Sequence, residues 1–166
     1  MNKRTPVCLV LKSAVLLVTL LCVFPLFATN PQKKEMKELN VKKVSLANVA
    51  VENVPALLDK EKVDFQSINT VNWKAFPYQP EVQFRIAHTD DAILVHYKVK
   101  EASVRAVAAG DNGAVWEDAC VEFFSIPAGD GIYYNVECNC AGILLIGAGA
   151  GRENREHAPQ EVMDKV

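Results

Sequence analysis

A tryptophan and several acids lie together in residues 115–124, which read Val-Trp-Glu-Asp-Ala-Cys-Val-Glu-Phe-Phe. The stretch is predicted to run from a loop into a strand, where successive side chains point to opposite faces. Trp116, Asp118 and Glu122 share one face if the strand extends back that far. An aromatic ring can cover the apolar face of a sugar while carboxylates accept its hydroxyl hydrogens. The stretch therefore indicates a site for a polyhydroxylated ligand. A core tryptophan beside solvated acids is the structural alternative.

The elements that must position these residues are predicted to be short strands. Apolar and polar residues alternate over 82–88 and 92–99, with turn residues between them, which is typical of an antiparallel hairpin. The other candidate elements are strands at 103–107, 120–126, 132–139 and 143–146 and a helical turn at 54–60. Helical periodicity is almost absent elsewhere. We expect an all-β fold, an antiparallel β-sandwich.

Strand parity predicts which side chains share a face. In the hairpin, the set expected to face inward is Phe84, Ile86, Ile93, Val95, Tyr97 and Val99. In the next strand pair, we expect Glu122 to lie opposite Asn135, because this register matches apolar side chains with one another. Tyr133 and Glu137 then join Glu122 and Asn135 on one polar face.

The first 28 residues have the layout of a secretory signal. A basic start at Lys3 and Arg4 precedes an apolar run over 14–24, and small or polar residues follow from Ala28. The run is short for a membrane span of about 20 residues. We expect cleavage near Ala28 and export to the periplasm, the cell surface or the medium. An uncleaved anchor and lipid attachment at Cys22 are the alternatives.

The mature chain is predicted to be a single acidic domain. Residues 29–43 are polar and lysine-rich, which predicts a leader ahead of a domain at residues 44–166. The whole chain has a net charge of −2, and cleavage removes three basic residues while keeping all 20 acids. The domain lacks the basic surface that a phosphate backbone requires, so we expect no nucleic-acid partner.

The domain keeps three cysteines, Cys120, Cys138 and Cys140. An odd number leaves at least one free thiol or an intermolecular bond. The predicted register places Cys120 and Cys138 on opposite faces, which disfavours a disulfide between them. We expect buried free thiols that act as small hydrophobic side chains. A zinc site that combines Cys138, Cys140 and His157 lacks a fourth ligand.

Several of these segments resemble the family 9 carbohydrate-binding modules, in the variant found in exported Bacteroidetes proteins. The resemblance covers roughly residues 41–166 and depends on Trp73, the hairpin after it, the motif at 116–123 and the strand at 133–137. It implies a β-sandwich that binds an oligosaccharide or polysaccharide. It also implies partnership with glycan-degrading enzymes.

In that family, two tryptophans clamp the end of a sugar chain. The resemblance implies that Trp116 forms one wall and that Glu122 binds a hydroxyl, while Asn135 stands where the family has a basic sugar-contacting residue. Glu137, on the same face, completes the predicted site. The family's second tryptophan lies near its C-terminus, and Trp73 is expected to cap the core instead. We therefore expect a sandwich and a site that lack their last strands.

The resemblance further implies structural calcium held by acids in loops. The candidate ligands are Asp90, Asp91, Asp111 and Asp130. Solvation at the surface explains each of these acids as well.

The alternative function is a module or fragment of a secreted, xylanase-like glycoside hydrolase. Such enzymes use two carboxyl groups about 5–9.5 Å apart. Asp118 and Glu122 lie about 13 Å apart along an extended strand, whereas Glu122 and Glu137 lie closer across two strands. No further motif supports catalysis, so we predict no catalytic residue. The glycine-rich run at 147–152 lacks the setting of a nucleotide site, and we expect a flexible loop there.

Overall fold

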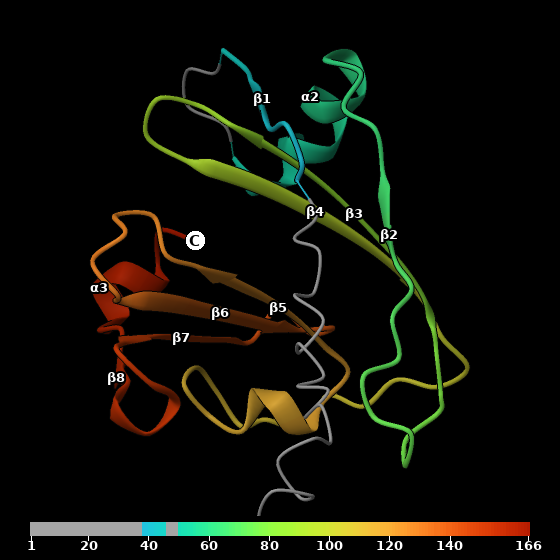
Figure 1. Cartoon of the computed structure of the whole chain (residues 1–166), viewed down its shortest axis with the longest axis vertical. Helices are drawn as coiled ribbons and strands as arrows, with labels where there is room; N and C mark the ends of the chain where they lie inside the picture. Colours follow the sequence, from blue (N-terminus) through green and yellow to red (C-terminus); the bar gives the residue numbers. More distant parts are fainter. Residues whose placement is uncertain (1–37, 46–49) are drawn as a thin grey trace, which may run out of the picture. The chain divides into compact units, whose positions relative to one another are not determined.

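The computed structural model describes residues 38–45 and 50–166. Within these residues, the unit that begins at Asn40 contains two four-stranded sheets, A and B (Figure 1). All strand pairs except the one formed by the short β1 are antiparallel. The expected all-β sandwich is confirmed. In the described part of the chain, no helix has the length and apolarity needed to cross a membrane. The predicted signal at residues 1–28 lies outside it.

Sheet A comprises β1 (Lys42–Lys43), β2 (Gln66–Ile68), β3 (Glu81–His88) and β4 (Ile93–Lys100). The predicted hairpin is confirmed as β3 and β4, which pair along their full length. Thr89 closes the turn, because its hydroxyl oxygen accepts a hydrogen bond from the Ala92 amide at 2.9 Å. The last two residues of the predicted polar leader form β1 and pair with the end of β3.

The buried core of sheet A lies beneath a helix. The 3-10 helix η1 (Val51–Asn53) runs into α2 (Val54–Lys60), where a helical turn was predicted. The core residues are Val44, Val54, Leu58, Ala87 and Leu94. The face predicted to be inward is the other one: its Ile93 and Val99 are exposed, and the remaining members are half-buried. The predicted face lies toward sheet B, where Tyr97 bonds to the Glu122 carbonyl, but the fully buried core forms on the less apolar face because α2 covers it. Strand alternation carries no signal of such a cover.

One charged side chain is buried within sheet A. Arg85 is 3% exposed; its guanidinium donates to Asp59 Oδ1 at 2.6 Å, to the Pro55 carbonyl at 2.9 Å and to His96 Nδ1 at 3.1 Å. The guanidinium also lies over the Phe65 ring, 4.5 Å from its centroid. The side chain thus joins β3, β4 and α2.

His96 makes the stability of this cluster depend on pH. Burial, followed by the nearby charge of Arg85, lowers the pKa of His96 below its ordinary value. The unfolded chain therefore binds more protons below about pH 6.5. We expect the full contribution of neutral His96 above that pH and a falling free energy of unfolding as the pH drops toward the lowered pKa. Urea unfolding between pH 5 and 8 should show this slope in wild type and a flatter one in His96→Gln. His157→Gln, at an exposed position, is the control; an unchanged slope in His96→Gln contradicts the prediction.

Sheet B comprises β5 (Cys120–Ser125), β6 (Tyr133–Asn139), β7 (Leu144–Gly149) and β8 (Glu156–His157), in that order. Glu122 pairs with Glu137 rather than with Asn135, so the predicted register was wrong by two residues. A shift of two keeps side-chain parity, and the predicted polar face is preserved. The chain ends in η3 (Arg152–Asn154) and α3 (Gln160–Met163).

One predicted strand is absent, and one predicted loop is part of a strand. Residues 103–107 form no strand, because the amide of Val107 is bound by a carboxylate at 2.8 Å instead of a neighbouring strand. The glycine-rich run, expected to be a loop, supplies the second half of β7. Trp73, expected to cap the core, is 70% exposed.

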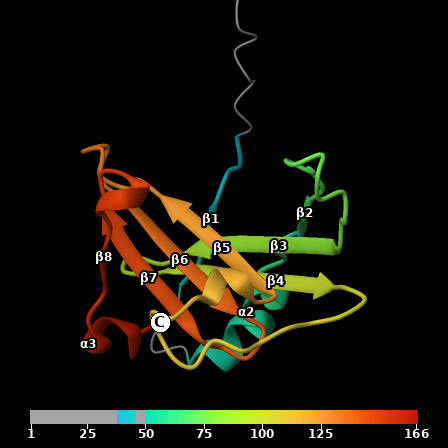
Figure 2. The same cartoon turned by 90° about the horizontal axis from the view of Figure 1, so that it is seen from below.

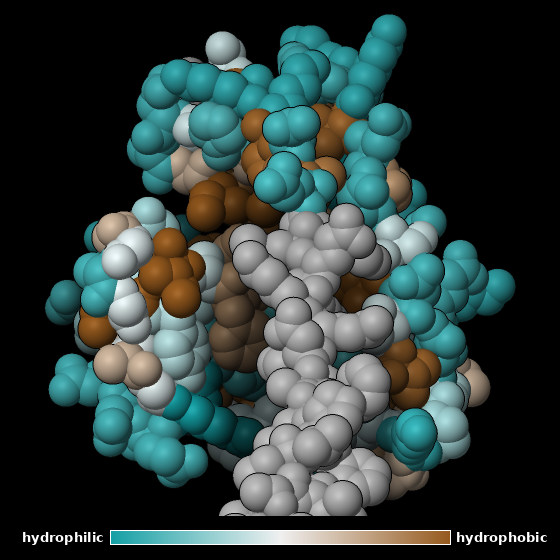
Figure 3. All heavy atoms as spheres, viewed as in Figure 1, coloured by the Kyte–Doolittle hydropathy of each residue, from teal (hydrophilic) through white to brown (hydrophobic). Residues whose placement is uncertain are grey.

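The two sheets approach each other along β4 and β5. Figure 2 shows β5, β6 and β7 running obliquely across β3 and β4. The Tyr97 hydroxyl donates to the Glu122 carbonyl at 3.1 Å, which links the sheets. A groove of about 370 Å³ lies there, lined by Val82, Tyr97 and Val99 from sheet A and by Val121 from sheet B. Figure 3 shows apolar side chains on the visible surface between the two sheets.

Candidate functional site

Trp116 lies on a short helix and not on a strand. The 3-10 helix η2 (Val115–Glu117) precedes β5, which starts only at Cys120. Val115 is fully buried and anchors η2, whereas Trp116 is 54% exposed. The prediction that Trp116 and Glu122 lie on one strand was therefore wrong. Trp116 nevertheless presents its ring to solvent from an element that packs against β5 and β6.

Asp118 holds this element in place. Its side chain is fully buried beside Arg105. Its carboxylate accepts hydrogen bonds from the amides of Val107 and Ala108, at 2.8 and 3.0 Å, and from Asn139 Nδ2 at 2.9 Å. These bonds, first of all those from the two amides, lower the pKa of Asp118 below its usual value. Asp118 is structural.

The predicted site residues on sheet B form two levels. Glu122 is exposed, whereas Asn135 is fully buried and Glu137 is 4% exposed. Asn135 Nδ2 donates to Glu137 Oε1 at 2.7 Å. Partial burial, followed by the negative charge of Glu137, raises the pKa of Glu122. The structure thus brings Glu122 and Glu137 together as cross-strand neighbours, with Glu122 at the surface and Asn135 beneath.

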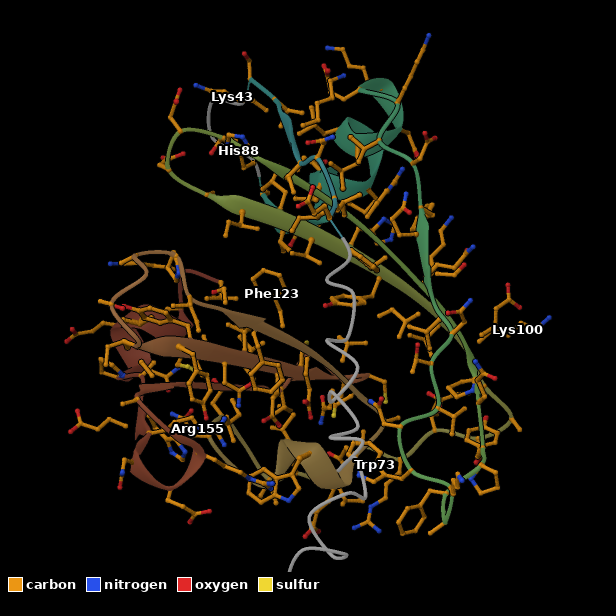
Figure 4. All side chains as sticks on the ribbon, viewed as in Figure 1. Lys43, Trp73, His88, Lys100, Phe123 and Arg155 are labelled. Atoms are coloured by element: carbon orange, nitrogen blue, oxygen red, sulfur yellow. The ribbon has the colours of Figure 1, made fainter. Side chains whose placement is uncertain are left out.

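An arginine that the motif did not indicate joins this face. The Arg155 guanidinium lies 5.8 Å from the centroid of the Tyr133 ring, and Tyr133 contacts Phe124 with ring centroids 6.2 Å apart. Figure 4 shows Arg155 and Phe123 on opposite sides of sheet B, with Phe123 toward sheet A. The positive charges of Arg155 and Arg152 partly oppose the rise in the pKa of Glu122.

Two glycines make room for Arg155. Gly147 and Gly149 lie opposite Asn135 and Tyr133 in the strand register. A Cβ at Gly149 would meet the Asn154 carbonyl oxygen closer than real Cβ atoms come, and one at Gly147 would contact the Arg155 side chain at 3.6 Å. The alternating glycines were the signal in the sequence for this approach, although they were interpreted as a loop.

The loop acids predicted for calcium are held by local bonds. Asp91 accepts from the Thr89 hydroxyl at 2.7 Å, Asp111 from the Leu144 amide at 3.0 Å and Asp130 from the Ile132 amide at 3.0 Å. Asp90 pairs with Lys43. Within the described residues, these acids do not gather into one group of potential metal ligands. Calcium binding at these acids stays a prediction.

An all-β unit that exposes an indole ring and a carboxylate is typical of a carbohydrate-binding module. The protein-family model described as "Carbohydrate-binding family 9" matches residues 52–166 of the sequence. The chain belongs to this family.

A solved crystal structure also resembles the chain. It is that of a "putative carbohydrate-binding protein from Bacteroides uniformis", with 63% sequence identity and a TM-score of 0.71. The match covers 76% of this chain and 58% of that one. A comparison with curated proteins gives no match. The predicted resemblance to family 9 is confirmed.

Proposed function

We propose that this protein binds carbohydrate without transforming it, as an exported module in polysaccharide breakdown. The sugar ring stacks on Trp116, and the sugar hydroxyls donate hydrogen bonds to Glu122. The observation that carries the proposal is the exposure of this indole on η2, next to the sheet that presents Glu122. The described part of the chain has one further tryptophan, Trp73, which lies in the segment between β2 and β3.

The two-level arrangement gives Asn135 and Glu137 a supporting part in binding. Both side chains are buried and bonded to each other, so they support Glu122 from below and set where its carboxylate lies. Arg155 and Tyr133 form a second edge of the same face. A basic residue therefore reaches this face from the turn after β7 instead of from the position of Asn135.

The contacts support a weak and specific site. Aromatic packing contributes about 0.5–1.5 kcal/mol beyond the area it buries, and a hydrogen bond to a charged group contributes about 1.5–3 kcal/mol. After the cost of association, affinities in the micromolar to millimolar range follow. Such affinities suit a module that keeps an exported glycan-degrading enzyme near its substrate.

The two tryptophans provide a matched test of the stacking. We expect Trp116→Ala to weaken binding about tenfold, which corresponds to about 1.4 kcal/mol, because the apolar contact is lost. Trp73→Ala should bind as wild type does, since Trp73 is also exposed but lies on another segment. The measurement is a titration of the full chain with plant and host glycans, followed by tryptophan fluorescence and calorimetry. Unchanged affinity in Trp116→Ala, or an equal loss in Trp73→Ala, overturns the proposal.

One observation favours a hydrolase as the second candidate. Carboxylate oxygens of Glu122 and Glu137 lie within 4.8 Å of each other, close to the spacing of about 5–5.5 Å used by retaining glycosidases. Burial of Glu137 opposes this function, because a substrate reaches only Glu122. Release of reducing sugar that disappears in Glu122→Gln would favour the enzyme; release by neither protein, with binding retained in wild type, favours the module.

A further inference from the structure

Three potential metal ligands gather on the polar face of sheet B. Cys120 Sγ and one carboxylate oxygen each from Glu122 and Glu137 lie within 4.8 Å of one another. Cys120 and Glu122 are two residues apart on β5, so both point to the same face of the sheet. Glu137 lies directly opposite Glu122 on β6. The strand register therefore builds the cluster from two adjacent rigid elements.

Two buried oxygen atoms in or beside this cluster lack a hydrogen-bond partner. Glu137 Oε2 and Asn135 Oδ1 are buried and have no hydrogen-bond partner among the described residues, although the Asn135 amide binds the other oxygen of Glu137. A buried carboxylate is costly unless a charge or a full set of hydrogen bonds compensates it. In the described part of the chain, neither Glu122 nor Glu137 forms an ion pair.

The thiol of Cys120 also differs from the two other thiols. Cys138 Sγ lies 3.5 Å from the Asn139 carbonyl oxygen and Cys140 Sγ lies 3.7 Å from that of Arg105, whereas no such contact is found for Cys120 in the described residues. The three groups therefore lie together with one buried carboxylate oxygen unpaired, and a bound cation would compensate that oxygen.

We propose that Cys120, Glu122 and Glu137 bind a divalent transition-metal ion of the zinc class. One thiolate with two carboxylates suits zinc, because calcium and magnesium take oxygen ligands. A tetrahedral zinc ion about 2.0–2.3 Å from its ligands holds them about 3.3–3.8 Å apart. Small side-chain rotations close the present separations, and the exposed Glu122 is free to make them. The fourth position is open to water, or to a ligand hydroxyl on this face.

Binding of the ion releases the thiol proton to solvent and forms a bond between Cys120 Sγ and the metal, without a change in oxidation state. The ion brings a positive charge against the orphaned oxygen of Glu137. It also occupies part of the coordination capacity of Glu122. The metal site does not depend on the proposed sugar binding, since its ligands are defined by the strand register alone.

Cobalt provides the test, because a thiolate bound to Co²⁺ gives a charge-transfer absorption in the near ultraviolet. The chelator-treated full chain is titrated with Co²⁺ and then with Zn²⁺. We expect the band to saturate at one equivalent, to vanish when Zn²⁺ is added and to be absent in Cys120→Ser. Cys138→Ser is the matched control, because its thiol lies on the opposite face; the band should persist there. Glu122→Gln, at an exposed position, should weaken Zn²⁺ binding at least tenfold without loss of folding.

Three results would overturn the proposal: no band in wild type, a band that survives in Cys120→Ser, or equal loss in Cys120→Ser and Cys138→Ser. Circular dichroism of each variant separates loss of the metal from loss of the fold. Sugar is absent from these measurements, so failure of the metal site leaves the result of the Trp116→Ala titration unaffected.

Discussion

Replacement of Asn139 by alanine should destabilise the domain and weaken sugar binding, although Asn139 does not belong to the proposed site. Its Oδ1 accepts from the amides of Ala141 and Ile143 at 3.0 and 2.9 Å, and its Nδ2 donates to Asp118. Asn139 is 4% exposed, so its loss leaves the amides of Ala141 and Ile143 and a carboxylate oxygen of Asp118 without this partner in a largely buried place. At about 1–3 kcal/mol for each unsatisfied group, and with water reaching part of the turn, we expect a cost of about 2–4 kcal/mol.

The functional consequence follows from what the bonded groups support. Asp118 ends η2, and its bonds connect η2 to the segment at Val107 and Ala108 and to β6. Without Asn139, the position of Trp116 relative to sheet B is less well fixed. We therefore expect weaker binding of the glycan that wild type selects, at temperatures where Asn139→Ala is still folded.

Urea unfolding measures the first effect and calorimetry with the glycan measures the second. Asn154→Ala is the control for stability, because Asn154 is exposed in η3 and surface substitutions usually change stability by less than about 0.5 kcal/mol. If Asn139→Ala has the unfolding midpoint of wild type, the network does not hold η2 as described.

Replacement of Arg85 by methionine should destabilise sheet A and leave sugar binding intact. Methionine keeps much of the apolar stem but loses the bonds to the Pro55 carbonyl, Asp59 and His96. Loss of a buried charged partner commonly costs about 3–5 kcal/mol. The carboxylate of Asp59 is 71% exposed and regains water, so we expect Arg85→Met to cost less than this range, about 2–3 kcal/mol.

A surface ion pair supplies the comparison for this prediction. Lys43 pairs with Asp90, with side chains 58% and 87% exposed. Such pairs contribute about 0–1 kcal/mol, so Lys43→Met should unfold almost as wild type does. Unfolding midpoints measure both effects. Equal midpoints for Arg85→Met and Lys43→Met would show that the buried guanidinium has no special role, and lost sugar binding in Arg85→Met would show that sheet A and the site are coupled.

The sequence predicted the faces of sheet B better than its register. A strand pattern repeats every two residues, so Glu122 opposite Asn135 and Glu122 opposite Glu137 match apolar with apolar side chains equally well. The turn between β5 and β6 decides between them. Its Gly129 and Gly131 adopt positive φ angles of 68° and 82°. The conformation of a loop of this length cannot be predicted from its composition.

The remaining differences arise from contacts between distant segments. Val107 lies in a stretch with strand-like composition, but the carboxylate of Asp118 takes its amide. Arg155 reaches the site only because β8 returns along β7. The bond to Val107 has no local pattern, whereas the alternating glycines of β7 signalled a close approach without identifying Arg155. By contrast, the exposure of Trp116 and Glu122 agrees with the sequence prediction, since both follow from a polar segment that enters an alternating strand.

Gly149 has a consequence for how this surface can change. No side chain separates β7 from the backbone at Asn154, so the height of the edge that carries Arg155 is set by direct contact between two main chains. A single methyl group at position 149 would act as a spacer and lift that edge away from Tyr133. The spacing between Arg155 and Tyr133 can therefore be changed by one small substitution beneath that edge, while every side chain proposed to contact the ligand keeps its identity.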